Sequence, residues 1–298
     1  MTKAIYITSL FLLLISFRTS AQTDTLRLKM QQIISTKKAD VGVSIYGIES
    51  KDTLNINIHK HYPMQSVFKF HIALAVLNQV DKGKLKITQK IYIKKSELLP
   101  DTWSPIREDY PNGDIKLTVA EIIKYTVAKS DNNGCDILLR LIGGTKIVND
   151  YIHTIGVKDV FIRANEEAMH KEWIVQFSNW ATPKSVTELL ILFYTKNILS
   201  KNSFDFLWET MLATSTGKKR IKGQLPEGAL VAHKTGTSGT NEQGVTAAIN
   251  DIGIVTLPNG EHFTISVFVV NSKENEETNE KIISDIAKLT WDYFMHKQ

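Results

Sequence analysis

The sequence contains a single cysteine, Cys135, among 298 residues. An intrachain disulfide is therefore excluded, and because Cys135 lies far from the N-terminus it cannot be the lipid-modified cysteine of a processed lipoprotein. The fold must be stabilised by its apolar core. A hydrophobic content of 43% over this length is sufficient for one large domain or two interlocked lobes.

A strong charge of one sign is also missing. The formal net charge is +5, and Lys3 and Arg18 near the N-terminus account for two of these charges, so the rest of the chain carries +3. This excess is too small to predict binding to nucleic acid. The basic run Lys218-Lys219-Arg220 is expected on the solvated surface, although Arg220 is also a candidate for a functional role.

Patterns that bind metals or nucleotides are absent from the sequence. His59-Lys60-His61 is the only close histidine pair, and no aspartate or cysteine follows at the spacing of metal ligands. We therefore expect these side chains to alternate near the end of a strand. Because no glycine-rich phosphate loop is present either, the sequence predicts no metal and no cofactor.

One apolar run stands out near the N-terminus, over residues 5–17. It follows the positive Lys3 and precedes the small residues Thr19-Ser20-Ala21, a pattern typical of an export signal with its cleavage site. The run is shorter than the roughly 20 residues of a spanning helix. We therefore expect a signal peptide over residues 1–21 and a secreted mature chain that begins at Gln22 without a membrane anchor.

Hydrophobic periodicity divides the mature chain into strands, helices and strands again. Strands are expected over residues 41–48, 53–59, 229–236, 245–257 and 262–270. Helices are expected over residues 67–81, 119–128, 135–142, 183–194, 203–212 and 276–294. Short connections favour pairing of neighbouring strands, so the two ends of the chain should share one antiparallel sheet. The sequence thus predicts a single domain over 22–298, with an α/β lobe from about 22–62 and 214–298 and a helical lobe from about 63–213.

The strongest candidate nucleophile is Ser66, in the motif Ser66-Val67-Phe68-Lys69. The pattern serine-x-x-lysine is weak alone, since residues 35–38 and 215–218 also match it. Ser66 differs because it immediately precedes a strongly apolar helix, which places its hydroxyl at the positive end of the helix dipole. Lys69 shares that helix face and can reach the hydroxyl, and a serine needs such a neighbour because its free hydroxyl is a poor nucleophile.

Two further motifs change the interpretation of the first. Ser130-Asp131-Asn132 lies between two expected helices, in a turn whose side chains can project into a cleft, with Asp131 expected to be structural. Lys234-Thr235-Gly236 ends an expected strand, where Gly236 allows a ligand to approach the backbone. Alone, each motif is consistent with a cap or a strand end. Together and in this order, the three motifs predict a catalytic site.

This set of motifs resembles the signature of class A serine β-lactamases and penicillin-binding proteins. The resemblance covers nearly the whole mature chain, including Trp103-Ser104-Pro105 and Asn165-Glu166. It is greatest for the PER and VEB type of extended-spectrum enzymes, on residues 63–66, 164–166 and 232–239. It implies an α/β (α+β) fold in which a five-stranded antiparallel sheet is flanked by helices and an all-helical lobe is inserted.

The resemblance also implies the catalytic roles. Ser66 would attack the lactam carbonyl, while the backbone N–H groups of Ser66 and Thr237 hold the oxyanion. Lys69 would help to activate Ser66, and Ser130 would pass a proton to the departing nitrogen. Glu166 would activate the water that hydrolyses the ester. Whether Lys69 or Glu166 is the base during acylation is left open.

Substrate binding is implied in the same way. Asn132 would bind the amide of the substrate's side chain, and Trp103 would border the cleft entrance. The residues expected to bind substrate are Trp103, Asn132, His170, Arg220, Lys234, Thr235, Gly236 and Thr237. The expected partners are small-molecule β-lactams and mechanism-based inhibitors, bound by a monomer in the periplasm of a Gram-negative bacterium, where hydrolysis gives antibiotic resistance.

Related activities remain as alternatives at this point. A penicillin-binding carboxypeptidase or a serine glutaminase would share the motifs, but Glu166 stands where the lactamases carry the deacylating carboxylate. A class D enzyme would have a serine-x-valine motif in place of Ser130-Asp131-Asn132. A non-hydrolytic β-lactam sensor would keep Ser66 and Lys69 but would usually extend from a membrane segment.

The loop around the catalytic glutamate departs from the commoner class A pattern. Ala164 and Asn179 stand where many relatives carry an arginine and an aspartate that close the loop with an ion pair. His170 replaces the usual loop asparagine, and a helix residue that helps to hold the loop is Asp136, while Arg163 could supply a cation in a shifted register. We therefore expect a loop held by different hydrogen bonds, with more space for oxyimino-cephalosporins.

Overall fold

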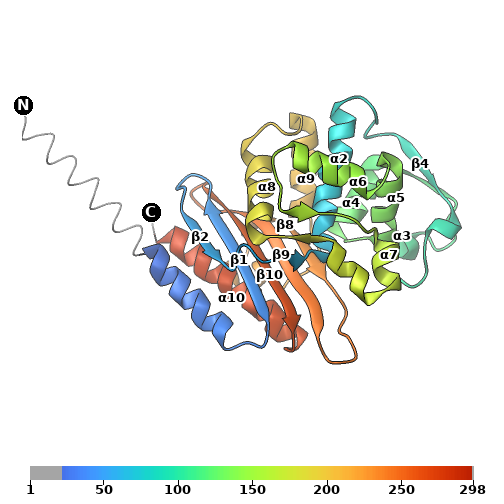
Figure 1. Ribbon diagram of the computed structural model, residues 1–298. Helices are drawn as coiled ribbons and strands as arrows, with labels where there is room; N and C mark the ends of the chain where they lie inside the picture. The colour runs from blue at the N-terminus through green and yellow to red at the C-terminus, as the bar shows by residue number, and fades with distance from the viewer. Residues whose placement is uncertain (1–21, 297–298) are drawn as a thin grey trace, which may run out of the picture.

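A five-stranded antiparallel sheet forms the centre of the computed structural model, which describes residues 22–296 (Figure 1). The signal peptide expected over residues 1–21 lies outside this range. The strand order is β2-β1-β10-β9-β8. The strands are β1 (Asp40–Gly47), β2 (Thr53–Ile56), β8 (Leu230–Thr237), β9 (Thr246–Thr256) and β10 (His262–Ser272). Because Asp40 of β1 pairs with Val270 of β10, the two ends of the chain share one sheet, as the sequence predicted.

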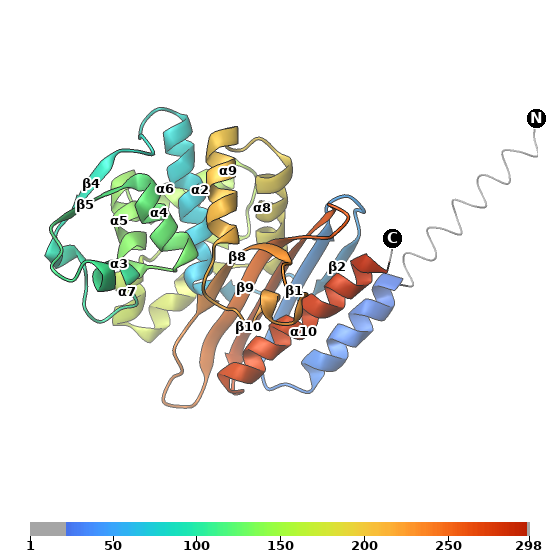
Figure 2. The same cartoon turned by 180° about the vertical axis from the view of Figure 1, so that it is seen from behind.

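Two helices cover one face of the sheet, namely α10 (Glu276–Met295) and a helix over residues 22–35 (Figure 2). The N-terminal helix was not predicted from the sequence. Its Leu26 and Met30, one turn apart, are buried in the same apolar cluster as Ile282 and Ile286 of α10. This cluster also takes alternate side chains of the strands, including Val231 of β8.

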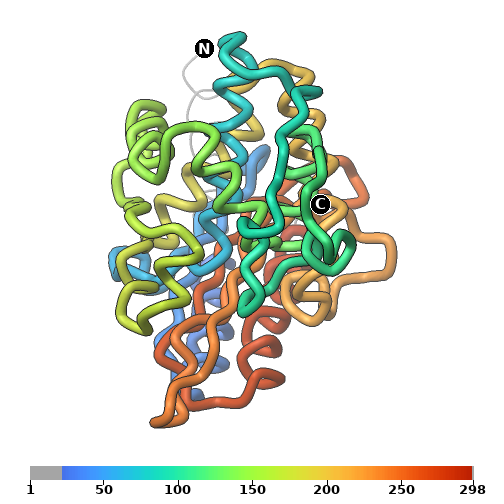
Figure 3. Tube along the Cα trace, turned by 90° about the vertical axis from the view of Figure 1, so that its right-hand side faces the viewer, coloured from blue at the N-terminus to red at the C-terminus, as the bar shows by residue number. Residues whose placement is uncertain are grey.

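The opposite face of the sheet packs against the helical part of the chain. Helix α8 (Pro183–Thr195) contacts β1, β9 and β10, while α9 (Lys201–Leu212) contacts β8. Figure 3 shows most of the helical segments (cyan to yellow) gathered above the strands at the chain ends. Ala232 of β8 is buried in the cluster on this side. Since side chains alternate along a strand, Lys234 faces the helices as well.

The buried helix that follows Ser66 is α2 (Phe68–Asp81). Its first ten residues are all buried, in agreement with the strongly apolar helix expected from the sequence. Gly83, just beyond its end, has φ +70°, the left-handed conformation that terminates a helix at low cost. Two polar side chains, Lys69 and His71, are buried along with the apolar ones.

Burial of His71 makes the free energy of unfolding of the protein depend on pH. Burial lowers the pKa of His71 to about 4, with weak opposition from the Val67 carbonyl. Because the unfolded chain takes up this proton near pH 6.5, stability present above that pH is lost as pH falls towards 4. Between pH 7 and pH 4.5, wild type should lose about 2–3 kcal/mol more stability than His71→Leu, as measured by urea unfolding. Equal losses in the two proteins would contradict this expectation.

Helices α4 (Val119–Ala128) and α5 (Asn132–Ile142) lie beside α2. The sequence predicted α4 correctly but started α5 three residues late, at Cys135. Asp131 is the N-cap of α5, because its Oδ1 accepts the Gly134 N–H at 2.7 Å. Asn132 was predicted to lie in the preceding turn, but it is the first residue of the helix.

Several elements were not predicted, most of them because they are too short to show a clear period. They are α3 (Pro105–Asp109), α6 (Thr145–Thr154), α7 (Glu166–Lys171), β3 (Tyr62–Pro63), β4 (Lys90–Ile93), β5 (Ile115–Thr118), β6 (Val160–Phe161) and β7 (Trp180–Ala181). Within residues 22–296, none of the helices combines the length and hydrophobicity needed to cross a bilayer.

Candidate active site

Ser66 lies in a short 3-10 turn, η1 (Gln65–Val67), that leads directly into α2. Gln65 has φ +49°, so the chain enters this turn in a conformation that a non-glycine residue rarely adopts. Strand β8 packs tightly behind the turn. A Cβ on Gly236 would lie 2.4 Å from the Met64 carbonyl oxygen, so the close approach that needs glycine here is to the backbone before Ser66.

The Lys69 ammonium is fully buried beside Ser66. Its Nζ donates to Ser66 Oγ at 2.9 Å and to the Ser130 carbonyl at 2.9 Å, and it also donates to Asn132 Oδ1. Glu166 Oε1 lies 2.9 Å from the same nitrogen and 3.4 Å from Ser66 Oγ. One hydroxyl, one ammonium and one carboxylate are thus in mutual contact, which is the arrangement that activates a serine.

Glu166 was predicted to lie in a loop, but it is the first residue of the short helix α7. Asn165 caps this helix, since its Oδ1 accepts the Ala168 N–H at 3.0 Å. Asp136 of α5 accepts the N–H groups of Glu166 at 2.8 Å and Glu167 at 2.9 Å. Burial raises the pKa of Asp136 to about 6, and the two backbone N–H groups oppose this rise. These contacts fix α7 to α5 and so place the carboxylate near Ser66.

Asn179 closes the segment that carries α7. Its Oδ1 accepts the N–H groups of Arg163 at 2.7 Å and Ala164 at 2.9 Å, and its Nδ2 donates to the Ala164 carbonyl at 2.8 Å. Hydrogen bonds from one buried amide therefore stand in place of an ion pair, in agreement with the expectation from the sequence. The Arg163 guanidinium lies over the Phe161 ring, 5.2 Å from its centroid, and it forms no ion pair with a side chain of residues 22–296.

Ser130 and Lys234 meet on the other side of Lys69. Ser130 has φ +60°, and its Oγ accepts from Lys234 Nζ at 2.9 Å. Burial lowers the pKa of Lys234 well below its usual range, and the charge of Lys69 adds to this effect. The neighbouring Thr235 Oγ1 is 2.7 Å from Thr216 Oγ1, a contact that no motif indicated.

Arg220 is buried, although the run 218–220 was expected on the solvated surface. Its Nη2 donates to Thr237 Oγ1 at 2.8 Å, and its Nη1 donates to the carbonyls of Gly236 and Asn250, both at 3.1 Å. Its Nε lies 3.1 Å from Glu280 Oε1. The guanidinium is thus held under the end of β8, where it contacts the hydroxyl of Thr237.

Asn132 lines the cleft together with Thr237 of β8, and its backbone N–H donates to the Trp103 carbonyl at 3.0 Å. The Asn132 Nδ2 donates to Thr102 Oγ1 at 2.6 Å, so both ends of its amide make contacts. Trp103 is 54% exposed, and its indole N–H donates to the Lys129 carbonyl at 2.9 Å. Asp131 accepts from Ser104 Oγ at 2.9 Å and from backbone N–H groups, consistent with the structural role expected for it.

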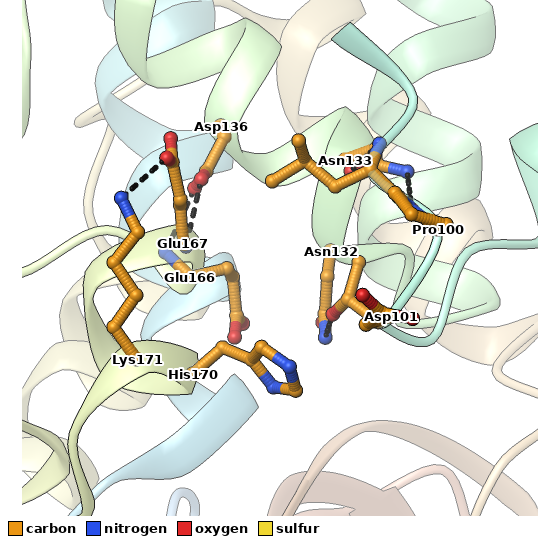
Figure 4. A pocket seen from close by; sticks show the side chains of 11 residues that line it. Pro100, Asp101, Asn132, Asn133, Asp136, Glu166, Glu167, His170 and Lys171 are labelled. Atoms are coloured by element: carbon orange, nitrogen blue, oxygen red, sulfur yellow. Dashed lines mark hydrogen bonds and ion pairs between the residues drawn. The ribbon is translucent and has the colours of Figure 1, made fainter. Parts of the chain in front are cut away.

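Two cavities adjoin Glu166. The larger, of about 400 Å³, is lined by Gln65, Thr102, Asn132, Glu166, Met169, His170, Trp173, Gln176, Thr237, Ser238 and Gly239. The smaller, of about 160 Å³, is lined by Leu99, Pro100, Asp101, Thr102, Asn132, Asn133, Asp136, Glu166, Glu167, His170 and Lys171. Figure 4 shows this smaller cavity, with the Glu166 carboxylate, the His170 ring and the Asn132 amide turned towards its centre.

Some lining residues were missed by sequence reasoning, and others that it named lie elsewhere. Gln65, Gln176 and Trp173 line the larger cavity. Gln65 stands in the stretch 63–66 that carried the resemblance but was given no role, whereas Gln176 and Trp173 belong to no motif that could have indicated them. Trp103 is absent from the lining of both cavities. His61, of the close histidine pair, stacks on Trp180 with ring centroids 3.5 Å apart. Among residues 22–296, no three histidine, cysteine or acidic side chains are grouped so that they could hold a metal ion.

Comparison with known proteins identifies this arrangement. The model of a family described as "Beta-lactamase enzyme family" matches residues 25–294. β-Lactamase VEB-1 from Pseudomonas aeruginosa is 56% identical over 93% of each chain, and the extended-spectrum β-lactamase PER-1 from the same species is 43% identical over 95% of this chain and 91% of its own. The crystal structure of TLA-3 extended-spectrum β-lactamase superposes with a TM-score of 0.90 at 55% identity, covering 91% of this chain and 99% of that one. The chain therefore belongs to the class A β-lactamases.

Proposed function

We propose that this enzyme hydrolyses penicillins and cephalosporins, including oxyimino-cephalosporins, through an acyl-enzyme on Ser66 that is released by a water activated by Glu166. β-Lactam hydrolysis with antibiotic resistance is the activity of the family. The observation that carries the catalytic assignment is the mutual contact of Ser66 Oγ, Lys69 Nζ and Glu166 Oε1, at 2.9 to 3.4 Å.

Acylation begins when Ser66 Oγ attacks the lactam carbonyl carbon. The hydroxyl proton leaves to the Lys69 and Glu166 pair, and the carbonyl oxygen becomes an oxyanion held by the backbone N–H groups of Ser66 and Thr237. The C–N bond then breaks, the nitrogen takes the proton of Ser130 Oγ, and the proton that left Ser66 is passed on from Lys69 to restore the Ser130 hydroxyl. The hydrogen bond that Lys234 Nζ donates to Ser130 Oγ at 2.9 Å supports this step, because it stabilises the oxygen as its proton leaves.

Deacylation requires a second nucleophile, which is water. Glu166 removes a proton from this water as its oxygen attacks the ester carbonyl. The ester C–O bond then breaks, and the proton held by Glu166 passes to the departing Ser66 Oγ, which restores both groups. The fixation of α7 by Asp136 supports this role, because a general base must be held within hydrogen-bond reach of the water. The Glu166 side chain is only 12% exposed, which favours one positioned water over bulk solvent.

Substrate recognition is assigned to the two walls of the cleft. On the β8 side, Lys234, Thr235 and Thr237 bind the substrate's carboxylate. Arg220 acts through Thr237, since its guanidinium donates to that hydroxyl. On the other side, Asn132 binds the side-chain amide, and His170 lines the same cavity. Gly236 of β8 and Trp103 complete the expected binding set.

Class A β-lactam hydrolysis is favoured over the alternatives, which are a carboxypeptidase, a glutaminase, a class D enzyme and a β-lactam sensor. A carboxylate beside the nucleophile is what separates rapid hydrolysis from a trapped ester, and Glu166 lies 3.4 Å from Ser66 Oγ. We also propose that the enzyme acts as a monomer in the periplasm. The expected export pattern over residues 1–21 supports this location.

Oxyimino-cephalosporins are expected to be good substrates. The amide of Asn179 holds the α7 segment without an ion pair, and the cavity of about 400 Å³ lies beside Glu166. Relief of one poor contact is worth roughly 1–3 kcal/mol in specificity, or about 10- to 200-fold. We expect kcat/KM for cefotaxime or ceftazidime to lie within about two orders of magnitude of that for cephalothin. A thousandfold deficit for both oxyimino compounds would show that the cleft is not enlarged.

A further inference from the structure

The larger cavity has one indole in its lining, that of Trp173. This residue begins the 3-10 segment η3 (Trp173–Ser178), which follows α7. The residue is 38% exposed, so part of its flat apolar surface remains in contact with solvent. Most of the other groups that line the cavity are polar, and the thioether of Met169 is the main apolar exception. A planar ring entering the cavity would therefore find its best apolar contact at Trp173.

The position of Trp173 is tied to that of the nucleophile. Its carbonyl accepts from Gln176 Nε2 at 2.7 Å, and Gln176 Oε1 accepts from the buried Gln65 Nε2 at 2.6 Å. Gln65 directly precedes Ser66. The Trp173 and Phe177 rings also pack in an edge-to-face arrangement, with centroids 6.2 Å apart and planes inclined by 67°. The backbone of Trp173 is thus fixed, and its ring rests on Phe177, before substrate enters, so little conformational entropy is lost on binding.

We propose that Trp173 is a specificity-determining residue, whose indole face packs against the heteroaromatic ring of the acyl side chain of cephalosporins. The inference rests on the proposed function and names the contact that selects substrates within it. Trp103, the aromatic residue indicated by the sequence, is less suited to this contact, because its N–H is bound to the Lys129 carbonyl and it does not line the cavity. Substrates with a short aliphatic acyl group leave the Trp173 face in water and gain nothing from it.

The test compares three cephalosporins that share one nucleus and differ in the acyl group. They are cefotaxime, with an aminothiazole oxime, cephalothin, with a thiophene ring, and 7-acetamidocephalosporanic acid, which has no ring. For Trp173→Ala, kcat/KM should fall about 10- to 100-fold with the first two substrates and less than about threefold with the third. Trp173→Phe keeps a planar ring and should retain most of the activity.

Ile174→Ala is the matched control, because Ile174 is the adjacent residue, is 69% exposed and does not line the cavity. It should leave all three kcat/KM values unchanged. Equal losses on all three substrates in Trp173→Ala would indicate a general structural role and overturn the inference, as would unchanged values on cephalothin. If wild type fails on cefotaxime alone, the proposed breadth of substrates is wrong, while cephalothin still decides the role of Trp173.

Discussion

Replacing Ser66 with alanine is expected to abolish β-lactam turnover. The hydroxyl of Ser66 is the group that Lys69 and Glu166 both contact, so its loss removes the nucleophile and leaves only binding and oxyanion contacts. Loss of a serine nucleophile of this kind costs roughly 10⁵- to 10⁶-fold in kcat. The rate is measured with a chromogenic cephalosporin, and covalent labelling by penicillin is followed by mass spectrometry of the intact protein.

Ser35→Ala provides a matched control for Ser66→Ala. Ser35 also stands three residues before a lysine, Lys38, but its hydroxyl is exposed and donates to the Gln32 carbonyl. This variant should keep full turnover and full labelling. A penicilloyl adduct that forms at a comparable rate in Ser66→Ala would show that another residue is the nucleophile.

Replacing Glu166 with alanine is expected to separate the two halves of the reaction. Acylation can continue, because Lys69 still contacts Ser66 Oγ at 2.9 Å. Deacylation loses its general base, which contributes typically 10²- to 10⁴-fold. A stable acyl-enzyme should therefore accumulate. Stopped-flow kinetics should show a burst close to one equivalent of product, and mass spectrometry should show the adduct persisting for minutes or longer.

The adjacent carboxylate supplies the control for this second experiment. Glu167 lies on the same helix, but its side chain is paired with Lys171 at 2.8 Å on the surface. Glu167→Ala should deacylate at nearly the wild-type rate. If instead Glu166→Ala turned over at an undiminished rate while Glu167→Ala stalled, the water-activating role would belong to Glu167.

The contacts that could be predicted are those imposed by short-range geometry. Ser66 and Lys69 meet because residues three apart share a face of one helix. The sheet was predicted because its strands form distinct apolar, β-branched runs and short connections favour pairing of neighbouring strands. The meeting of Ser130 with Lys234, more distant in the chain, came from the resemblance to a known family and not from any local pattern.

What the sequence did not reveal depends on tertiary contacts between individual side chains. Gln65 and Gln176 are hydrogen-bonded across the fold, yet a glutamine carries no pattern that names its partner. Arg220 was placed with the solvated lysines before it, because its carboxylate partner Glu280 comes from a distant helix. Helix α7 was missed because six residues are too few to show a period, although its cap, Asn165, stands at the right place.

The pairing of β1 with β10 has a consequence for how the chain folds. Strand β1 has β2 on one side and β10 on the other, and Asp40 meets Val270 only near the end of synthesis. Contacts between such distant segments form slowly, because a long loop must close first. The N-terminal hairpin is therefore left without its inner neighbour until almost the whole chain has emerged. A chain cut short before β10 would lose more than its last strand, since the first two would have no sheet to join.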